Sequence, residues 1–204
     1  DQARAYVKKI NGENLILVGH SWGALVAMSW AAKYPQEVKG VISIAGLNMP
    51  LSGVSKIAND TGIFNLAYEL YFTNVARKVD SGSIEKFARR MFKPQDIPKA
   101  YLDYLGSELS RRLSTIKANK NDLVFTSQAL DKNFAGYNHM KMPIEIIHGV
   151  EDFLVPIKSQ AVAFNEVIPN SRLHILPTVG HMAHHFAFKE ISDSISYIRN
   201  FSLT

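Results

Sequence analysis

Two short apolar runs stand out in the first part of the chain: NLILVGH at residues 14–20 and EVKGVISIAG at residues 37–46. Neither run alternates strictly between apolar and polar positions, which predicts strands covered on both faces, as in a parallel sheet. MPIEIIHGVED at residues 142–152 and SRLHILPTVGH at residues 171–181 predict two further strands. The chain therefore has the strands of an α/β fold.

Helical patterns separate these strands. Residues 22–34 favour a helix whose alanines permit close packing, and Pro35 follows where such a helix should stop. Strand, helix and strand over residues 14–46 form a βαβ unit with a right-handed crossover. Further helices are expected at residues 1–10, 156–168 and 184–201.

The pattern changes in the middle of the chain, where aromatic and aliphatic residues recur at helical spacing. We interpret residues 47–141 as a helical insertion between two parts of one α/β core, residues 1–46 and 142–204. Aromatic side chains of the insertion either pack its helices together or line a pocket, and helical spacing favours packing. They include Phe64, Tyr68, Tyr71, Phe72, Phe87 and Phe92.

Composition narrows the function classes. The 204 residues are 47% hydrophobic and 20% charged, which is enough apolar material to bury one substantial core. The sequence contains no run of eighteen apolar residues, so it predicts no transmembrane segment. No cysteine is present, which excludes disulfides and a cysteine nucleophile. The net charge of +5 comes from residues 47–141, with 14 basic against 9 acidic side chains. The excess basic side chains fit either solvated helices or the steering of an anionic substrate. We expect no nucleic-acid partner, because no cluster of basic residues is interleaved with aromatic residues.

Ser21 lies where the first predicted strand turns into a helix. Gly19 and Gly23 flank it at minus two and plus two, giving the G-x-S-x-G pattern of a nucleophile elbow, a tight turn that exposes the serine hydroxyl. The first backbone N–H groups of the following helix have no partner inside the helix. We therefore expect the Trp22 N–H to donate to an oxyanion.

A serine nucleophile needs a base, and the base needs an acid to orient it. Asp152 is the preferred acid because it lies one short loop after the apolar residues IEIIHG at 144–149 and before Pro156; Glu151 is its rival. His181 lies at the end of the last predicted strand segment, where a loop can bring its imidazole over the serine. We predict a triad of Ser21, Asp152 and His181.

The remaining histidines receive structural interpretations. His184 and His185 lie at the start of the next helix, where surface or capping roles are expected, and His148 and His174 are strand-end and strand residues. His20 is interpreted as a packing residue. No H-E-x-x-H spacing is present, so we expect no metal site.

The order Ser, Asp, His and the motifs GHSWG, HGVEDFLVP and VGHMAHH resemble the α/β-hydrolase superfamily. The resemblance implies an acyl hydrolase without a cofactor, in which Ser21 attacks a carbonyl, His181 moves the proton and Asp152 orients it. It also implies that the insertion is a cap over a largely apolar small-molecule acyl substrate. Relatives that open epoxides or remove halide usually carry an aspartate nucleophile, and Ser21 argues against both.

Complete members of the superfamily have more sheet before the nucleophile strand, including a loop that supplies a second oxyanion donor. We therefore expect this chain to be the C-terminal portion of a larger enzyme whose N-terminal segment completes the sheet. A cytoplasmic location is expected.

Ester hydrolysis is the leading activity, with a thioester or amide as related substrates. Carbon–carbon bond hydrolysis, cofactor-free peroxidation and aminopeptidase chemistry also occur on this fold, and a non-catalytic binding protein is the alternative from another class.

Overall fold

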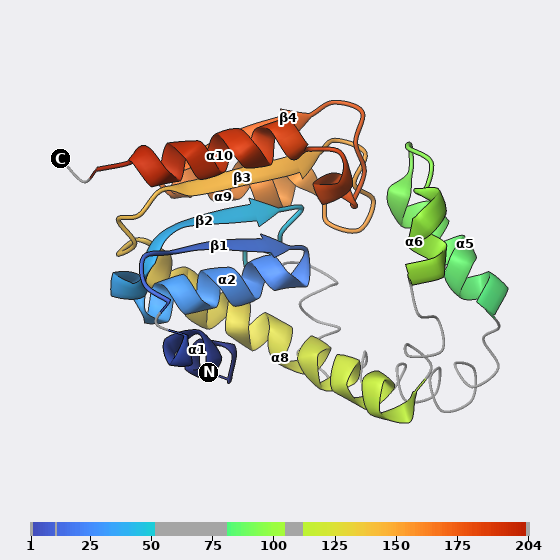
Figure 1. Ribbon diagram of the computed structural model, residues 1–204, viewed down its shortest axis with the longest axis horizontal. Coiled ribbons are helices and arrows are strands. Elements are labelled where there is room, and N and C mark those ends of the chain that lie inside the picture. Colours follow the sequence, from blue (N-terminus) through green and yellow to red (C-terminus); the bar gives the residue numbers. More distant parts are fainter. Residues whose placement is uncertain (1, 11, 52–80, 105–111, 203–204) are drawn as a thin grey trace.

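The computed structural model describes residues 2–10, 12–51, 81–104 and 112–202. Four parallel strands form one sheet in the order β1-β2-β3-β4, so neighbours in space are also neighbours in sequence (Figure 1). This confirms the α/β class and the four predicted strands. Their bounds are β1 Leu15–His20, β2 Val38–Ile44, β3 Ile144–Gly149 and β4 Ser171–Leu176.

Helices cover both faces of the sheet (Figure 1). On one face, a core cluster joins β2 and β3 to residues of α2, α8 and α9, and on the other face a second cluster includes residues of α10. The bounds are α2 Trp22–Lys33, α8 Leu113–Tyr137, α9 Ala163–Val167 and α10 Phe188–Asn200, with the π-helical turn η2 Lys158–Val162 before α9 and the 3-10 turn η3 Ala183–His185 before α10.

The end of α8 belongs to the packing of the sheet. Tyr137 is fully buried in the first core cluster and meets the Phe164 ring of α9 edge-on, with ring centroids 5.6 Å apart. Burial raises the pKa of Tyr137 because the phenolate would lose its hydration. The last turns of the predicted insertion therefore pack against the core.

Burial differs sharply between inner and outer strands. All six residues of β3 are buried, whereas β1 is mostly half-exposed and its Val18 side chain is 50% exposed. β1 is thus less covered than its apolar sequence predicted, because among the described strands only β2 pairs with it. Its other edge has no strand partner among the residues that the structure describes.

A buried carboxylate ties the far edge of the sheet to α10. Glu145 of β3 accepts hydrogen bonds from Arg172 and His174 of β4 and from Ser194 of α10, at 2.7–3.0 Å. Burial opposes its charge, but these three donors outweigh that cost and lower the pKa of Glu145. His174 is therefore a strand residue, as expected, with a defined partner.

The predicted N-terminal helix is α1 (Gln2–Lys9), whose Arg4 binds the Glu37 carboxylate of the turn η1 (Pro35–Glu37). In the described part of the chain, no helix combines the length and hydropathy needed to cross a membrane.

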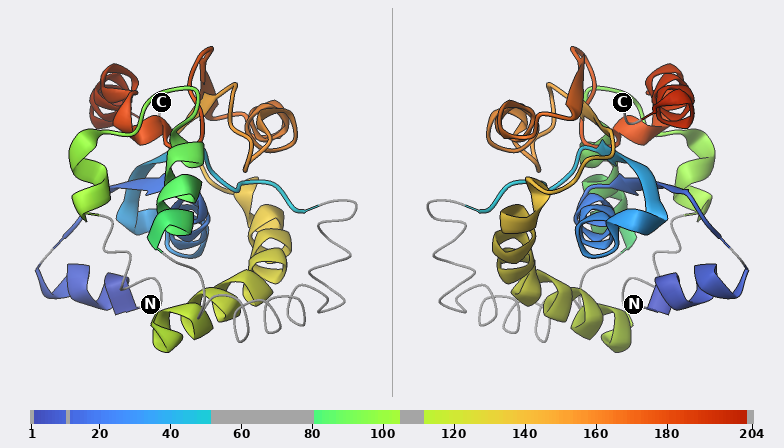
Figure 2. Two further views of the ribbon diagram at one scale, coloured as in Figure 1. Left: turned by 90° about the vertical axis from the view of Figure 1, so that its right-hand side faces the viewer. Right: turned by 90° about the vertical axis from the view of Figure 1, so that its left-hand side faces the viewer.

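Helices α5 (Ser81–Phe92) and α6 (Lys99–Tyr104) lie beyond the carboxyl ends of the strands, and they are drawn in green in front of the sheet in the left view of Figure 2. Phe87 is half-exposed and Phe92 is fully buried. The other aromatic residues considered for a pocket, Phe64, Tyr68, Tyr71 and Phe72, lie outside the described residues.

Candidate active site

The turn from β1 into α2 holds Ser21 in a strained conformation. Its φ of 53° and ψ of −122° lie in a region that side chains rarely adopt, a strain that costs about 1–3 kcal/mol and is typical of functional sites. The Ser21 N–H donates to the Ile44 carbonyl at 2.9 Å, which fixes the turn to the end of β2. The local geometry is that of a nucleophile elbow.

The two glycines of the motif differ in what surrounds them. A Cβ at Gly19 would overlap the Gly23 carbonyl, so the tight turn requires glycine there. At Gly23, no heavy atom of the described residues lies within 4 Å of a built Cβ. The turn therefore requires glycine at position 19, whereas the described residues leave room for a side chain at position 23.

Trp22 begins α2 directly after the elbow. Its backbone N–H is one of the first-turn donors that the helix itself leaves unpaired. The indole Nε1–H donates to Thr126 Oγ1 of α8 at 3.1 Å. This bond ties the start of α2 to the long helix α8.

Asp152 and His181 meet beside this end of the sheet. The Nδ1–H of His181 donates to Asp152 Oδ2 at 2.8 Å, and both residues are buried. The other oxygen, Oδ1, accepts the backbone N–H groups of Leu154 and Val155, each at 2.9 Å. The carboxylate is therefore held by the loop that carries it and faces the imidazole.

Burial opposes the charge of Asp152. Hydrogen bonds from His148, His181 and the Val155 N–H outweigh that burial and hold the pKa of Asp152 well below its ordinary value. The group is therefore a carboxylate at neutral pH, and it can orient the imidazole and stabilise positive charge on it.

Glu151, the alternative acid, is exposed. Its backbone N–H donates to the Val179 carbonyl at 3.0 Å, which anchors the loop, while the carboxylate is not among the groups bonded to His181. Two neighbouring carboxylates thus have opposite environments.

His148 is a site residue that the sequence interpretation missed. The fully buried ring lies at the end of β3, with Nε2 2.9 Å from the Val155 carbonyl and 3.4 Å from Asp152 Oδ2. Because a carbonyl only accepts, Nε2 carries the proton, and the ring fastens the Asp152 loop to the strand. The sequence carried no local signal for this contact, because a spacing of four residues brings side chains together in a helix and not at the end of a strand.

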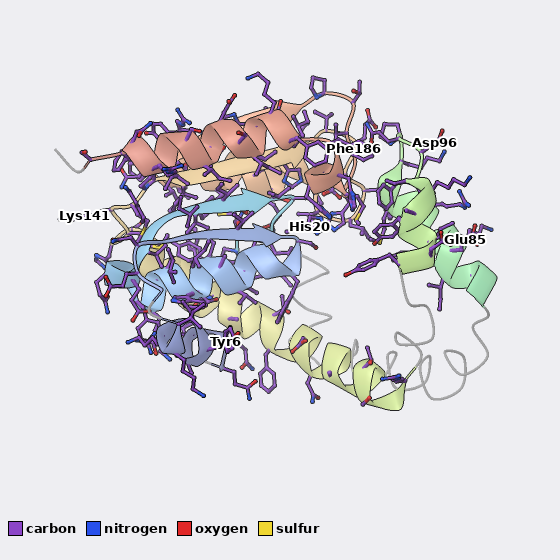
Figure 3. The ribbon with its side chains drawn as sticks, in the orientation of Figure 1. Tyr6, His20, Glu85, Asp96, Lys141 and Phe186 are labelled. Carbon is purple, nitrogen blue, oxygen red and sulfur yellow. The ribbon has the colours of Figure 1, made fainter. Side chains whose placement is uncertain are left out.

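His20 packs as predicted and also makes a bond across the sheet. It lies at the carboxyl end of β1 (Figure 3), and its Nε2–H donates to the backbone carbonyl of His181 at 2.9 Å. The two rings are tilted by 51° with centroids 4.8 Å apart. Burial, the largest influence, lowers the pKa of His20 to about 4.

The surface or capping roles expected for His184 and His185 are wrong. Both rings are partly buried, and His184 packs between His20, at 4.2 Å between centroids, and His185, at 4.3 Å. His185 in turn contacts Phe92 and Tyr101, at 5.0 and 5.4 Å. Helices α5 and α6 supply these two aromatic rings, which pack against His185.

This histidine packing predicts a pH-dependent stability. His20 and His184 each have a pKa of about 4 in the folded protein against an ordinary value of 6.5, because burial disfavours their charged forms. The unfolded chain therefore binds more protons between these values, and the free energy of unfolding falls as the pH falls from about 6.5 towards 4.

We expect His20, the more buried ring, to contribute a loss on the order of 1–2 kcal/mol between pH 7 and pH 5. Urea unfolding at both pH values measures the fall in the free energy of unfolding. His20→Gln should remove the part of this fall that comes from His20. The lowered pKa of Asp152 acts below about pH 4 and leaves this window unaffected. Equal stability at both pH values would contradict the prediction.

Asp152 fixes the His181 imidazole, and the His181 carbonyl accepts a hydrogen bond from His20, the residue before the elbow serine. Among the described residues, no hydrogen bond joins His181 to the Ser21 hydroxyl. Within the described ranges, no group of three or more His, Asp or Glu side chains is placed to hold a metal ion.

Comparison with known proteins supports the same fold. A family model described as the alpha/beta hydrolase fold matches residues 1–188. A cis-3-alkyl-4-alkyloxetan-2-one decarboxylase from Shewanella oneidensis is 25% identical over 98% of this chain, and this chain spans 64% of that relative's length.

Solved structures with low sequence identity share the architecture. A bromoperoxidase from Bacillus anthracis superposes with a TM-score of 0.74 at 17% identity, covering 98% of this chain and 72% of that one. An esterase from Exiguobacterium antarcticum does so with a TM-score of 0.67 at 18% identity, with the same coverages of 98% and 72%. The matched family model, together with the parallel sheet and the serine elbow, shows that this chain belongs to the α/β-hydrolase fold family.

Proposed function

We propose that the chain is the catalytic part of a serine hydrolase that cleaves a carboxylic ester, or a related thioester or amide. The observation that carries this proposal is the buried Asp152–His181 hydrogen bond at the end of the sheet where Ser21 occupies the elbow. A carboxylate, an imidazole and a serine at the carboxyl ends of the strands are the parts that acyl transfer needs.

In the proposed mechanism, the Ser21 hydroxyl attacks the substrate carbonyl while His181 Nε2 accepts its proton. Asp152 accepts the hydrogen bond from Nδ1 and stabilises the imidazolium. The oxyanion takes a hydrogen bond from the Trp22 N–H, the leaving alcohol takes the proton from His181, and an acyl ester remains on Ser21. Water, deprotonated by His181, then releases the acid and restores the serine.

Residues 47–141 are proposed to act as a cap over the acyl site. α5 and α6 support this, since Phe92 and Tyr101 contact His185 and the Arg90 guanidinium lies 4.3 Å from the centroid of the Phe153 ring. Phe153 directly follows Asp152. The cap would thus rest on the loops that carry the acid and the base, and it favours a substrate with a largely apolar group.

A fluorophosphonate probe tests the proposed nucleophile. The wild-type protein should gain one phosphonyl group, mapped by peptide mass spectrometry to Ser21, because such probes react with activated serines. The matched control is Ser29→Ala, which removes a hydroxyl that donates to the Leu25 carbonyl inside α2 and accepts from Asn133 of α8, and it should leave labelling intact. A protein that binds the substrate but takes no label would support a non-catalytic binding role instead.

The substrate class is tested with a panel of short p-nitrophenyl esters, thioesters, anilides and an alkyl-substituted oxetan-2-one, the last chosen because a relative is named for it. We expect ester cleavage to be fastest. The panel includes a carbon–carbon hydrolase substrate, a peroxidation assay and an aminopeptidase substrate, because one fold supports all of these reactions.

The free edge of β1 leads to a prediction about the sheet. We propose that an N-terminal segment pairs with this edge and supplies the second oxyanion donor. Supporting this, Val18 is 50% exposed, Trp22 and Val26 are also exposed, and no described strand pairs with that side of β1. Losing one oxyanion donor costs about 10²–10³ in kcat.

Residues 1–204 expressed alone are therefore expected to aggregate or to lack esterase activity, whereas a version that includes the upstream segment should be monodisperse and active. Size-exclusion chromatography and ester turnover measure both properties. Val18→Lys should reduce aggregation of residues 1–204 without restoring activity, because a charge on an edge strand blocks pairing but supplies no donor. Full activity of residues 1–204 alone would contradict the prediction.

A further inference from the structure

The sheet order places the proposed nucleophile and the proposed base at opposite edges of the sheet. Ser21 follows β1 at one edge of the sheet, whereas His181 follows β4 at the other, with β2 and β3 between them. The loop after β4 must therefore cross the ends of two strands to bring its imidazole to the serine. Asp152 holds the ring of His181 from β3, which leaves the backbone of His181 to be fixed on the β1 side.

We propose that His20 is a positioning residue that fixes the backbone of His181 to the nucleophile elbow through the hydrogen bond from its Nε2–H to the His181 carbonyl. The bond is 2.9 Å long and joins residues that are 161 positions apart. Because His20 directly precedes Ser21, it couples the base to the same rigid turn that carries the nucleophile. This inference rests on the proposed function, in which His181 is the base.

The carbonyl determines the tautomer of His20. A carbonyl oxygen only accepts hydrogen bonds, so His20 must keep its proton on Nε2. The ring is also held by packing, since it lies against His181, at 4.8 Å between centroids, and against His184, at 4.2 Å. Because these contacts hold the His20 ring in place, its hydrogen bond can hold the loop after β4 in a defined position.

A neutral His20 also suits the chemistry next to it. The titratable groups around the ring are His181, Asp152, His184 and His185, from the loops after β3 and β4. Burial keeps His20 uncharged above a pKa of about 4. His181 must become an imidazolium in the proposed cycle, and a second cation beside it would oppose that charge.

The consequence is geometric. Misplacing a catalytic group by about 1 Å can cost on the order of 10²-fold in rate. Loss of the His20 donor should therefore lower kcat and leave substrate binding nearly unchanged, because His20 holds the base and does not hold the substrate.

The test compares three variants in the complete protein. His20→Phe keeps an aromatic ring but removes the donor, and it should lower kcat about 10- to 100-fold with KM changed less than about threefold. His20→Gln places an amide N–H near the position of Nε2 and should recover most of the lost kcat. His184→Phe makes the same substitution in the neighbouring ring that packs against His20. It leaves the hydrogen bond from His20 to His181 in place and should retain wild-type kcat.

A purely structural role for His20 would lower the melting temperature and kcat of both His20 variants together, without rescue by glutamine. Wild-type kcat in His20→Phe would also overturn the inference. Either result leaves the serine hydrolase proposal standing, since that depends on Ser21 labelling.

A measurement without turnover separates the two proposals. In ¹⁵N imidazole NMR spectra, His20 should be the Nε2–H tautomer from pH 5 to pH 8. The low-field proton on His181 Nδ1, bonded to Asp152, should persist in His20→Gln and broaden in His20→Phe. An Nδ1–H tautomer at His20 would overturn the inference. This result does not depend on whether Ser21 reacts with the fluorophosphonate, so it tests the role of His20 separately from the role of Ser21.

Discussion

Ser21→Ala is expected to lower the kcat of ester hydrolysis by about 10³- to 10⁶-fold while leaving the fold intact. In the proposed mechanism, the Ser21 oxygen forms the covalent acyl intermediate, and no neighbouring side chain can replace that bond. Removing a triad nucleophile leaves only the catalysis that comes from substrate binding and oxyanion stabilisation. The measurement is turnover of a short p-nitrophenyl ester by the complete protein, together with its thermal unfolding.

The Ser21→Ala variant is expected to be as stable as the wild type. Ser21 has a φ of 53°, which alanine adopts no more easily than serine, so the strain of the turn stays the same. The Ser21 N–H that donates to Ile44 also remains. We expect an unchanged melting temperature, and Ser29→Ala serves as the activity control. Near-normal hydrolysis by Ser21→Ala would refute the nucleophile assignment.

Asp152→Asn is expected to lower kcat by about 10⁴-fold. The carboxylate accepts hydrogen bonds at Oδ1 from the Leu154 and Val155 N–H groups and at Oδ2 from His181. An amide keeps one acceptor oxygen, which the two backbone donors hold, and so turns its NH₂ group towards His181. The imidazole must then accept at Nδ1 and carry its proton on Nε2, where it cannot act as a base towards Ser21.

Glu151→Gln is the matched control for this prediction. It makes the same change from carboxylate to amide one residue earlier, on an exposed side chain, and should alter kcat less than about threefold. The low-field NMR signal of the His181 Nδ1 proton should vanish in Asp152→Asn and persist in Glu151→Gln. Equal losses of kcat in the two variants would show that the loop matters and that the Asp152 carboxylate does not.

The sequence by itself determined the fold class and the loops that carry the candidate site. Buried strands and their helices are local patterns, so the βαβ unit at residues 14–46 could be recognised without any knowledge of long-range contacts. The elbow is also local, since Gly19 and Ser21 are two positions apart and the tight turn depends on both. Motif order along the chain then predicted which loops would carry an acid and a base.

The tertiary structure decided how the side chains of those loops are used. Glu151 and Asp152 are adjacent and chemically alike, and only the fold of the loop buries one carboxylate against His181 and exposes the other. His148 and His20 looked like ordinary strand-end residues, because a hydrogen bond such as that from His20 to His181 joins positions 161 apart. Such contacts depend on sheet order and loop conformation, which are set by the packing of the whole domain and leave no local periodicity in the sequence.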